Sequence, residues 1–135
     1  MSETITETIT ETIGETYEKA CAALTADCQT KRNAMDADYL GRRAPIEAGF
    51  RARCIPLNTD YDAKRAALGT SQFQAKRFAL RDEYHASYAR LNADYQALCD
   101  PLEAAYQASH SALYADYREK LAALAANYQA IATAA

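Results

Sequence analysis

An 11-residue spacing of aromatic side chains constrains this sequence more than any other feature. The spacing runs from Tyr17 towards the C-terminus, Cys28 fills the one slot without an aromatic, and a single 12-residue step separates Tyr61 from Phe73. An aliphatic side chain follows each slot by seven residues. Eleven residues fill three helical turns at about 3.67 residues per turn, close to the 3.6 of an α-helix, so both kinds of residue stay on one side.

We therefore predict an all-α fold whose helices share one packing seam of aromatic and aliphatic residues. We assign the seam to Tyr17, Leu24, Tyr39, Ile46, Phe50, Leu57, Tyr61, Leu68, Phe73, Leu80, Tyr84, Leu91, Tyr95, Leu102, Tyr106, Leu113, Tyr117, Leu124 and Tyr128.

Alanine occupies the opposite side of the predicted helices. At about 98° per residue, the second and ninth positions after each aromatic fall near 180° from the seam. Most of these positions are Ala, for example Ala52, Ala97, Ala108 and Ala126. Helices with a second close-packing face would need neighbours on two sides. The alternative is that Ala is here only a good helix former facing solvent.

This pattern resembles the hendecad class of coiled coils, in which an 11-residue period gives a straight or slightly right-handed supercoil. Similar 11-residue repeats occur in late-embryogenesis-abundant proteins and in some lipid-binding helices. The resemblance covers residues 17–134 and concerns periodicity only. It implies helical packing or association and no particular activity.

The 12-residue step divides the repeats into two nearly equal arms. Gly69 suits the position after a helix end, and Thr70 or Ser71 suits the cap of a new helix. We predict a long antiparallel hairpin with arms at 17–68 and 71–134 and a turn at 69–71, within one repeat domain at 17–135. A single kinked rod is the alternative. Asp100-Pro101-Leu102-Glu103 also has the arrangement of a helix start.

Residues 1–16 form a separate arm rich in Thr, Ile and Glu, repeating Thr-Glu-Thr-Ile. As a helix, its Ile residues would make a ridge leading to Tyr17. As a strand, its Thr residues would line one face. Thr is a poor helix former, so we favour an extended arm, with helix and disorder as alternatives.

Charge is unevenly distributed along the chain. Residues 1–18 carry five acids and no base, whereas residues 19–90 carry more bases than acids. Basic residues recur in the repeats and are candidates for binding a polyanion or the acidic arm: Lys31, Arg32, Arg42, Arg43, Lys64, Arg65, Lys76 and Arg77. The alternative is that Asp residues four positions earlier pair with many of them, as in Asp27–Lys31 and Asp60–Lys64.

No combination of residues predicts catalysis, and we expect neither enzyme activity nor a cofactor. The four Cys lack a Cys-x-x-Cys spacing and suit small packed side chains. Folding at Gly69 would bring Cys28 level with His110 and Cys54 level with His85, but two ligands do not make a structural zinc site, so we predict no metal. We expect no signal peptide, no membrane span and a cytoplasmic location.

These features favour a structural protein that associates with itself into a helical bundle, sheet, tube or filament. The main alternative is a helical module that binds DNA, RNA or a protein partner. A stress-type protein that is disordered until dried is a further alternative, but ten Tyr and an uninterrupted aliphatic slot argue against it.

Overall fold

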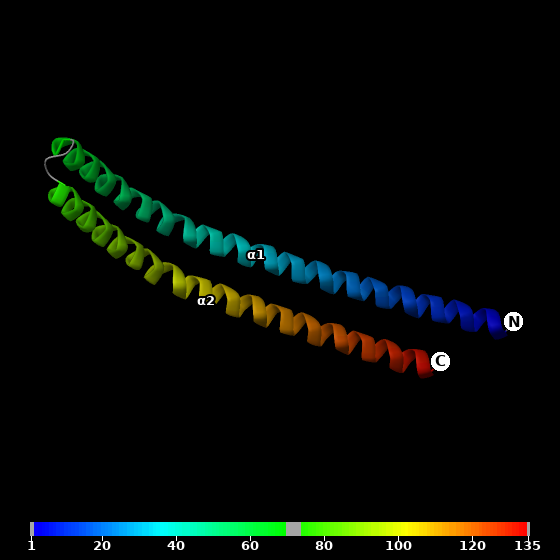
Figure 1. The fold of residues 1–135 in the computed structure, drawn as a ribbon. Coiled ribbons are helices and arrows are strands. Elements are labelled where there is room, and N and C mark those ends of the chain that lie inside the picture. Colours follow the sequence, from blue (N-terminus) through cyan, green and yellow to red (C-terminus); the bar gives the residue numbers. More distant parts are fainter. Residues whose placement is uncertain (1, 70–73, 135) are drawn as a thin grey trace. The chain divides into compact units, whose positions relative to one another are not determined.

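The computed structural model describes residues 2–69 and 74–134. These residues form two α-helices, α1 (Ser2–Ala67) and α2 (Gln74–Ala134), which pack against each other as a hairpin (Figure 1). The predicted all-α class and the hairpin are confirmed, and the kinked rod is excluded. None of the described helices is both long enough and apolar enough to cross a membrane.

Both helices contribute to two compact units. Unit 1 consists of Met1–Ala37 and Tyr106–Ala135, and therefore contains both chain ends. Unit 2 is the continuous segment Asp38–Ala105, which contains the connection between the helices. In each unit a stretch of α1 lies antiparallel to a stretch of α2.

Gly69 ends the first arm. Its φ of 64° is in the left-handed region that favours glycine, and its amide donates a hydrogen bond to the Ala66 carbonyl. The Arg77 guanidinium, from the start of α2, donates a hydrogen bond to the Gly69 carbonyl. Thr70 and Ser71, the predicted caps of the second helix, lie outside the described residues.

Both helices continue through their prolines. Pro45 and Pro56 lie inside α1, and Pro101 lies inside α2. The helix start that the sequence indicated at Asp100 is therefore wrong. Each proline removes one backbone hydrogen bond. We expect the packing of α1 against α2 to offset that loss.

Residues 2–16 belong to α1, so the extended arm that we favoured is wrong. The hydroxyls of Thr6, Thr8, Thr10, Thr12 and Thr16 donate to the carbonyl four residues earlier, at 2.8 Å for Thr8 to Thr4 and 2.9 Å for Thr12 to Thr8. This bonding gives each hydroxyl a partner without interrupting the helix, although Thr remains an unfavourable helix former.

Aromatic residues of the two helices meet ring to ring. In unit 1, Tyr17 stacks on Tyr128 with ring centroids 4.7 Å apart. In unit 2 the corresponding distances are 4.7 Å for Phe50 and Tyr95 and 4.5 Å for Tyr61 and Tyr84. Each pair joins the aromatic slot of one repeat to the aromatic slot of another, so the register is the same in both units.

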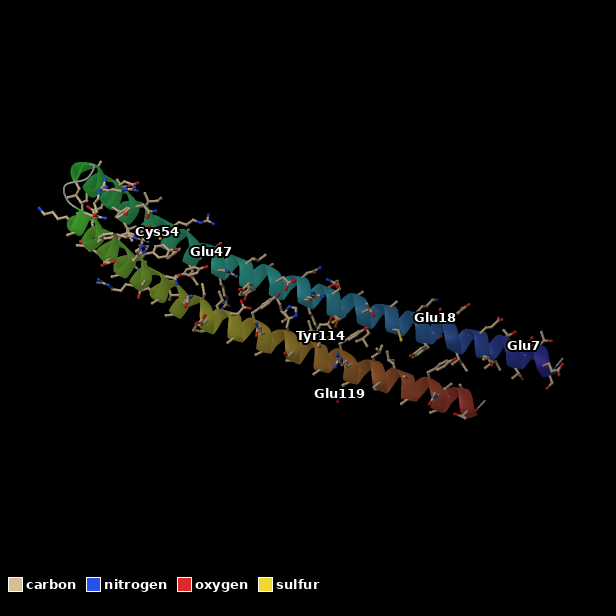
Figure 2. All side chains as sticks on the ribbon, in the orientation of Figure 1. Glu7, Glu18, Glu47, Cys54, Tyr114 and Glu119 are labelled. Carbon is tan, nitrogen blue, oxygen red and sulfur yellow. The ribbon has the colours of Figure 1, made fainter. Side chains whose placement is uncertain are left out.

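In unit 1 the antiparallel register places the N-terminal end of α1 beyond the last described residue of α2. Because Tyr17 lies opposite Tyr128, the end of α2 at Ala134 comes level with residue 11. Residues 2–10 therefore extend past α2, and Glu7 lies on this extension (Figure 2). All their side chains are exposed, including Ile5 and Ile9.

Candidate assembly interface

The side chains assigned to the seam are half-buried. Every one of them within residues 2–69 and 74–134 has this intermediate exposure, and Phe73 lies outside the described residues. No side chain in these ranges is fully buried. The two arms thus share a long contact, but a single hairpin does not enclose a core.

Tyr hydroxyls connect the two arms at repeated positions. In each case the other partner is the polar residue that directly follows the aliphatic slot of a repeat on the opposite helix, a slot that Met35 fills before Asp36. In unit 1 these pairs are Tyr117 with Thr25 at 3.1 Å and Tyr106 with Asp36 at 2.6 Å; in unit 2 they are Tyr84 with Asn58 at 2.7 Å and Tyr39 with Glu103. Sequence reasoning missed this set, although a polar residue recurring beside the aliphatic slot was visible.

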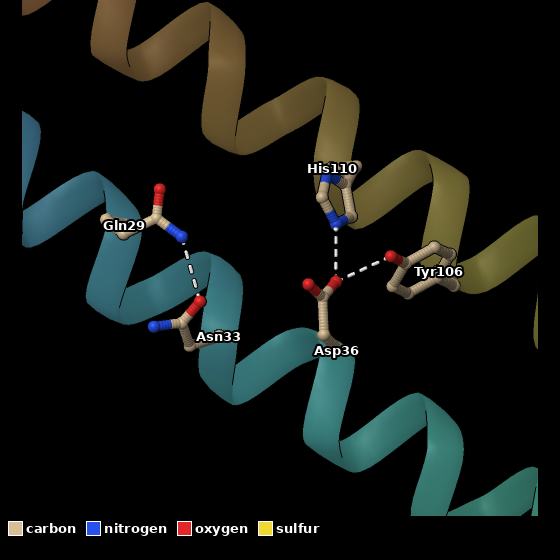
Figure 3. Close-up of polar contacts among 5 residues, drawn as sticks. All are labelled: Gln29, Asn33, Asp36, Tyr106 and His110. Carbon is tan, nitrogen blue, oxygen red and sulfur yellow. Dashed lines mark hydrogen bonds and ion pairs between the residues drawn. The ribbon is translucent and has the colours of Figure 1, made fainter.

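Asp36 is at the centre of a polar cluster in unit 1 (Figure 3). Its Oδ1 accepts a hydrogen bond from the Tyr106 hydroxyl and lies 3.1 Å from His110 Nε2. The hydrogen bonds from Tyr106 and His110 hold the pKa of Asp36 below its usual range, and Arg32 contributes to this lowering. Gln29 and Asn33 hydrogen-bond each other one turn away on α1.

Arg43 is at the centre of a second polar cluster, in unit 2. Its guanidinium donates to the Tyr39 hydroxyl at 2.8 Å, and hydrogen bonds to Tyr95 and Tyr39 raise the pKa of Arg43. Nε lies 2.8 Å from Glu47 Oε1, in an ion pair whose geometry is poor for a hydrogen bond. The bond to Glu103 raises the pKa of Tyr39.

The structure divides the candidate polyanion-binding residues into several environments. Within the helices, Lys31 pairs with Asp27 at 2.8 Å, Arg42 with Asp38 at 3.1 Å, and Lys64 with Asp60 at 3.0 Å. The partners of Arg43 and Arg77 are given above, Arg32 acts on Asp36 through its charge, and Lys76 is exposed. Acidic residues therefore neutralise much of the basic set locally.

One basic surface feature lies in unit 2, near the end of α1 and the start of α2. It is an open hollow of about 350 Å³ lined by Tyr61, Arg65, Arg77, Phe78, Leu80 and Arg81. No carboxylate of the described residues forms an ion pair with these three arginines. Phe78 is exposed beside them.

The outer faces of both helices are open. The Ala residues at the two positions opposite the seam are exposed throughout the described chain, as for Ala52, Ala97, Ala108 and Ala126. Large apolar side chains are exposed as well, among them Leu40 at 63%, Ile55 at 65% and Leu98 at 61%. The apolar surface of the hairpin is thus distributed over its seam and its outer sides.

The cysteines and histidines do not meet as the turn position suggested. His110 lies beside Asp36 rather than Cys28, and His85 contacts Arg81 and Tyr84. The expected juxtapositions are wrong because the paired aromatic slots set the register. Among residues 2–69 and 74–134, no group of three or more His, Cys, Asp or Glu side chains could hold a metal ion.

The architecture thus defines a class, a two-helix hairpin whose arms meet along a half-buried seam. Comparison with known proteins finds no matching protein family, no matching curated protein and no matching solved structure.

Proposed function

We propose that this chain is a structural protein that assembles with copies of itself through the outer faces of its hairpin. The observation that carries the proposal is the lack of any fully buried side chain among the described residues, combined with exposed Ala faces and exposed Leu, Ile and Phe side chains. A two-helix hairpin needs further neighbours to enclose a core.

Energetics support this reading. Hydrophobic stabilisation scales with the apolar area removed from water, at about 25 cal/mol per Å². A seam that is only half-buried on both helices gives part of that stabilisation, while ordering each residue costs about 1–2 kcal/mol of backbone entropy. Association that covers the remaining apolar surface would supply the further stabilisation needed to offset this entropy cost.

The shape of the outer face also supports association. Ala side chains allow a neighbouring helix to approach closely, and their regular recurrence along both arms would let one packing mode repeat. Such repetition suits a bundle, sheet, tube or filament.

The acidic N-terminal segment is the second element of the proposal. On the helix, Ile5 and Ile9 lie on the side opposite Glu3 and Glu7, because residues two positions apart are separated by about 200°. The segment beyond α2 therefore has an uncovered apolar ridge and a negative charge. We expect it to dock on a neighbouring copy near basic residues, with Arg65 a candidate because the described residues give it no ion-pair partner.

Light scattering and electron microscopy of the purified protein test the proposal. We expect a mass above that of one chain at tens of micromolar. The double variant Ala97→Glu with Ala108→Glu should give a smaller species with unchanged helicity. The matched control, Gln96→Glu with Gln129→Glu, adds the same charge to exposed positions of α2 next to the seam and should assemble as the wild type does.

A monodisperse monomer at all accessible concentrations would refute self-assembly. The polyanion-binding alternative would then be tested with DNA and RNA at increasing salt, since binding through phosphates weakens steeply with ionic strength.

A further inference from the structure

Three arginines near the end of α1 and the start of α2 lack the acidic neighbours that most bases of the chain have. Most bases have an acid four residues before or after them, as Lys64 has in Asp60. Arg65, Arg77 and Arg81 have none in either direction. Among residues 2–69 and 74–134 no carboxylate forms an ion pair with them, so their positive charge is open to an external anion.

These arginines line one open hollow together with two aromatic rings. Its volume of about 350 Å³ falls in the range of roughly 300–1,000 Å³ for small-ligand sites. The ring of Tyr61 already packs against Tyr84, with centroids 4.5 Å apart. Phe78 is 54% exposed, and no ring of the described residues stacks on it. The hollow therefore has an open aromatic face beside the guanidinium groups.

Protein acceptors hold two of the three arginines without using all their donors. Arg77 donates to the Gly69 carbonyl, and Arg81 donates Nε–H to His85 Nε2 at 3.4 Å. A guanidinium has several N–H donors in a planar fork, so both arginines keep donors for a ligand. Arg65, on the facing stretch of α1, makes no hydrogen bond or ion pair with another described residue.

We propose that this hollow binds a nucleotide, with its phosphate on the three arginines and its base on Phe78. A phosphate presents several acceptor oxygens around one negatively charged centre, so several guanidinium groups can bind it at once. Every nucleobase has a flat face that can stack on an exposed ring. A free nucleotide and one unit of a single-stranded nucleic acid share this chemistry. The inference goes beyond self-assembly and does not depend on it.

Binding measurements on the full chain test the arginines. Fluorescence anisotropy with a short labelled thymidine oligonucleotide and calorimetry with ATP should both detect binding, which should weaken as salt rises. Arg65→Gln with Arg81→Gln should lower the affinity at least about tenfold, because charge-assisted hydrogen bonds are lost. The matched control is Arg118→Gln, which removes an exposed arginine of α2 outside the hollow and should have no effect. An equal loss with this control would overturn the inference.

The base is tested separately from the phosphate. Phe78→Leu should keep the helicity and lower the affinity at least about fivefold, because base stacking is lost. Its control is Tyr114→Leu, which removes an exposed ring outside the hollow and should change nothing. Tripolyphosphate, which has no base, should bind more weakly than ATP. Equal binding of tripolyphosphate and ATP, or no loss with Phe78→Leu, would overturn the inference, as would no binding of either nucleotide probe.

The two probes also distinguish the sources of the nucleotide. Tighter binding of the oligonucleotide assigns the hollow to a single-stranded nucleic acid, and binding of ATP that is at least as tight assigns it to a free nucleotide. The acidic segment that we expect to dock near Arg65 would compete for one of the three arginines. A peptide of residues 2–16 has no aromatic ring for Phe78, so it should displace the oligonucleotide only weakly. A peptide that binds more tightly than both probes would overturn the inference, whereas a monomeric protein would refute self-assembly alone.

Discussion

Truncation of a seam leucine measures how far one hairpin covers its own seam. Leu113 of α2 is half-buried in unit 1, and Leu113→Ala removes about three methylene equivalents. At about 0.8 kcal/mol for each fully buried methylene, complete burial would give a loss near 2.4 kcal/mol from transfer alone. Since Leu113 stays partly exposed in the hairpin, we expect a loss of about 1–2 kcal/mol for an isolated chain.

Assembly changes this expectation. If a neighbouring copy covers the rest of Leu113, the loss should rise to the range of about 2–5 kcal/mol found for buried leucines. The assay is urea unfolding followed by the helical circular dichroism signal, at a dilution where light scattering gives the mass of one chain and again at high concentration. Stability that increases with protein concentration would itself indicate association.

An exposed residue of the same helix provides the control for this measurement. Gln96 lies outside the seam and is exposed, so Gln96→Ala should cost less than about 0.5 kcal/mol. Equal losses at Leu113 and Gln96 would refute the argument that the half-buried face stabilises the hairpin. If Leu113→Ala in the dilute monomer costs as much stability as truncation of a fully buried leucine, the hairpin alone covers the seam. That result would contradict the argument that the seam needs further neighbours.

Three further results are expected. Hydrogen bonds from Tyr106 and His110 hold the pKa of Asp36 low, so the stability they give is present above the usual Asp pKa of about 3.9 and is lost as pH falls through the lowered value. The urea midpoint of Asp36→Asn should therefore depend less on pH below about 4 than that of the wild type, and identical profiles would contradict this. Gly69→Ala should destabilise the hairpin by about 1 kcal/mol in the same unfolding assay, because φ at Gly69 is positive. Deletion of residues 2–13 should lower the mass of the assembly in light scattering without lowering the helicity per residue, and added salt should act in the same direction if docking is electrostatic, over a screening length of about 10 Å at 0.1 M.

The sequence by itself determined that the repeats from Tyr17 onwards are helical and that the first arm ends at Gly69. A period of 11 matches an α-helix closely enough to keep Tyr and Leu side chains on one side for the length of each arm. Gly69 is the residue that accepts a positive φ at the end of a helix, and it lies where the period slips. Both are local properties of a helix, so they could be read without knowing which residues lie opposite.

Only the tertiary structure decided which residues lie opposite one another. The register follows from ring contacts such as Tyr17 with Tyr128 and from Tyr hydroxyls that bond across the hairpin, and neither can be located from spacing within one helix. The same register placed His110 beside Asp36 instead of Cys28 and joined Arg53 to Asp94. Residues 2–16 are helical although Thr disfavours helix, because Thr hydroxyls bond to carbonyls four residues earlier and the segment continues α1 from Tyr17. A propensity acts on each residue alone, whereas a helix that is already formed and packed extends at little additional cost.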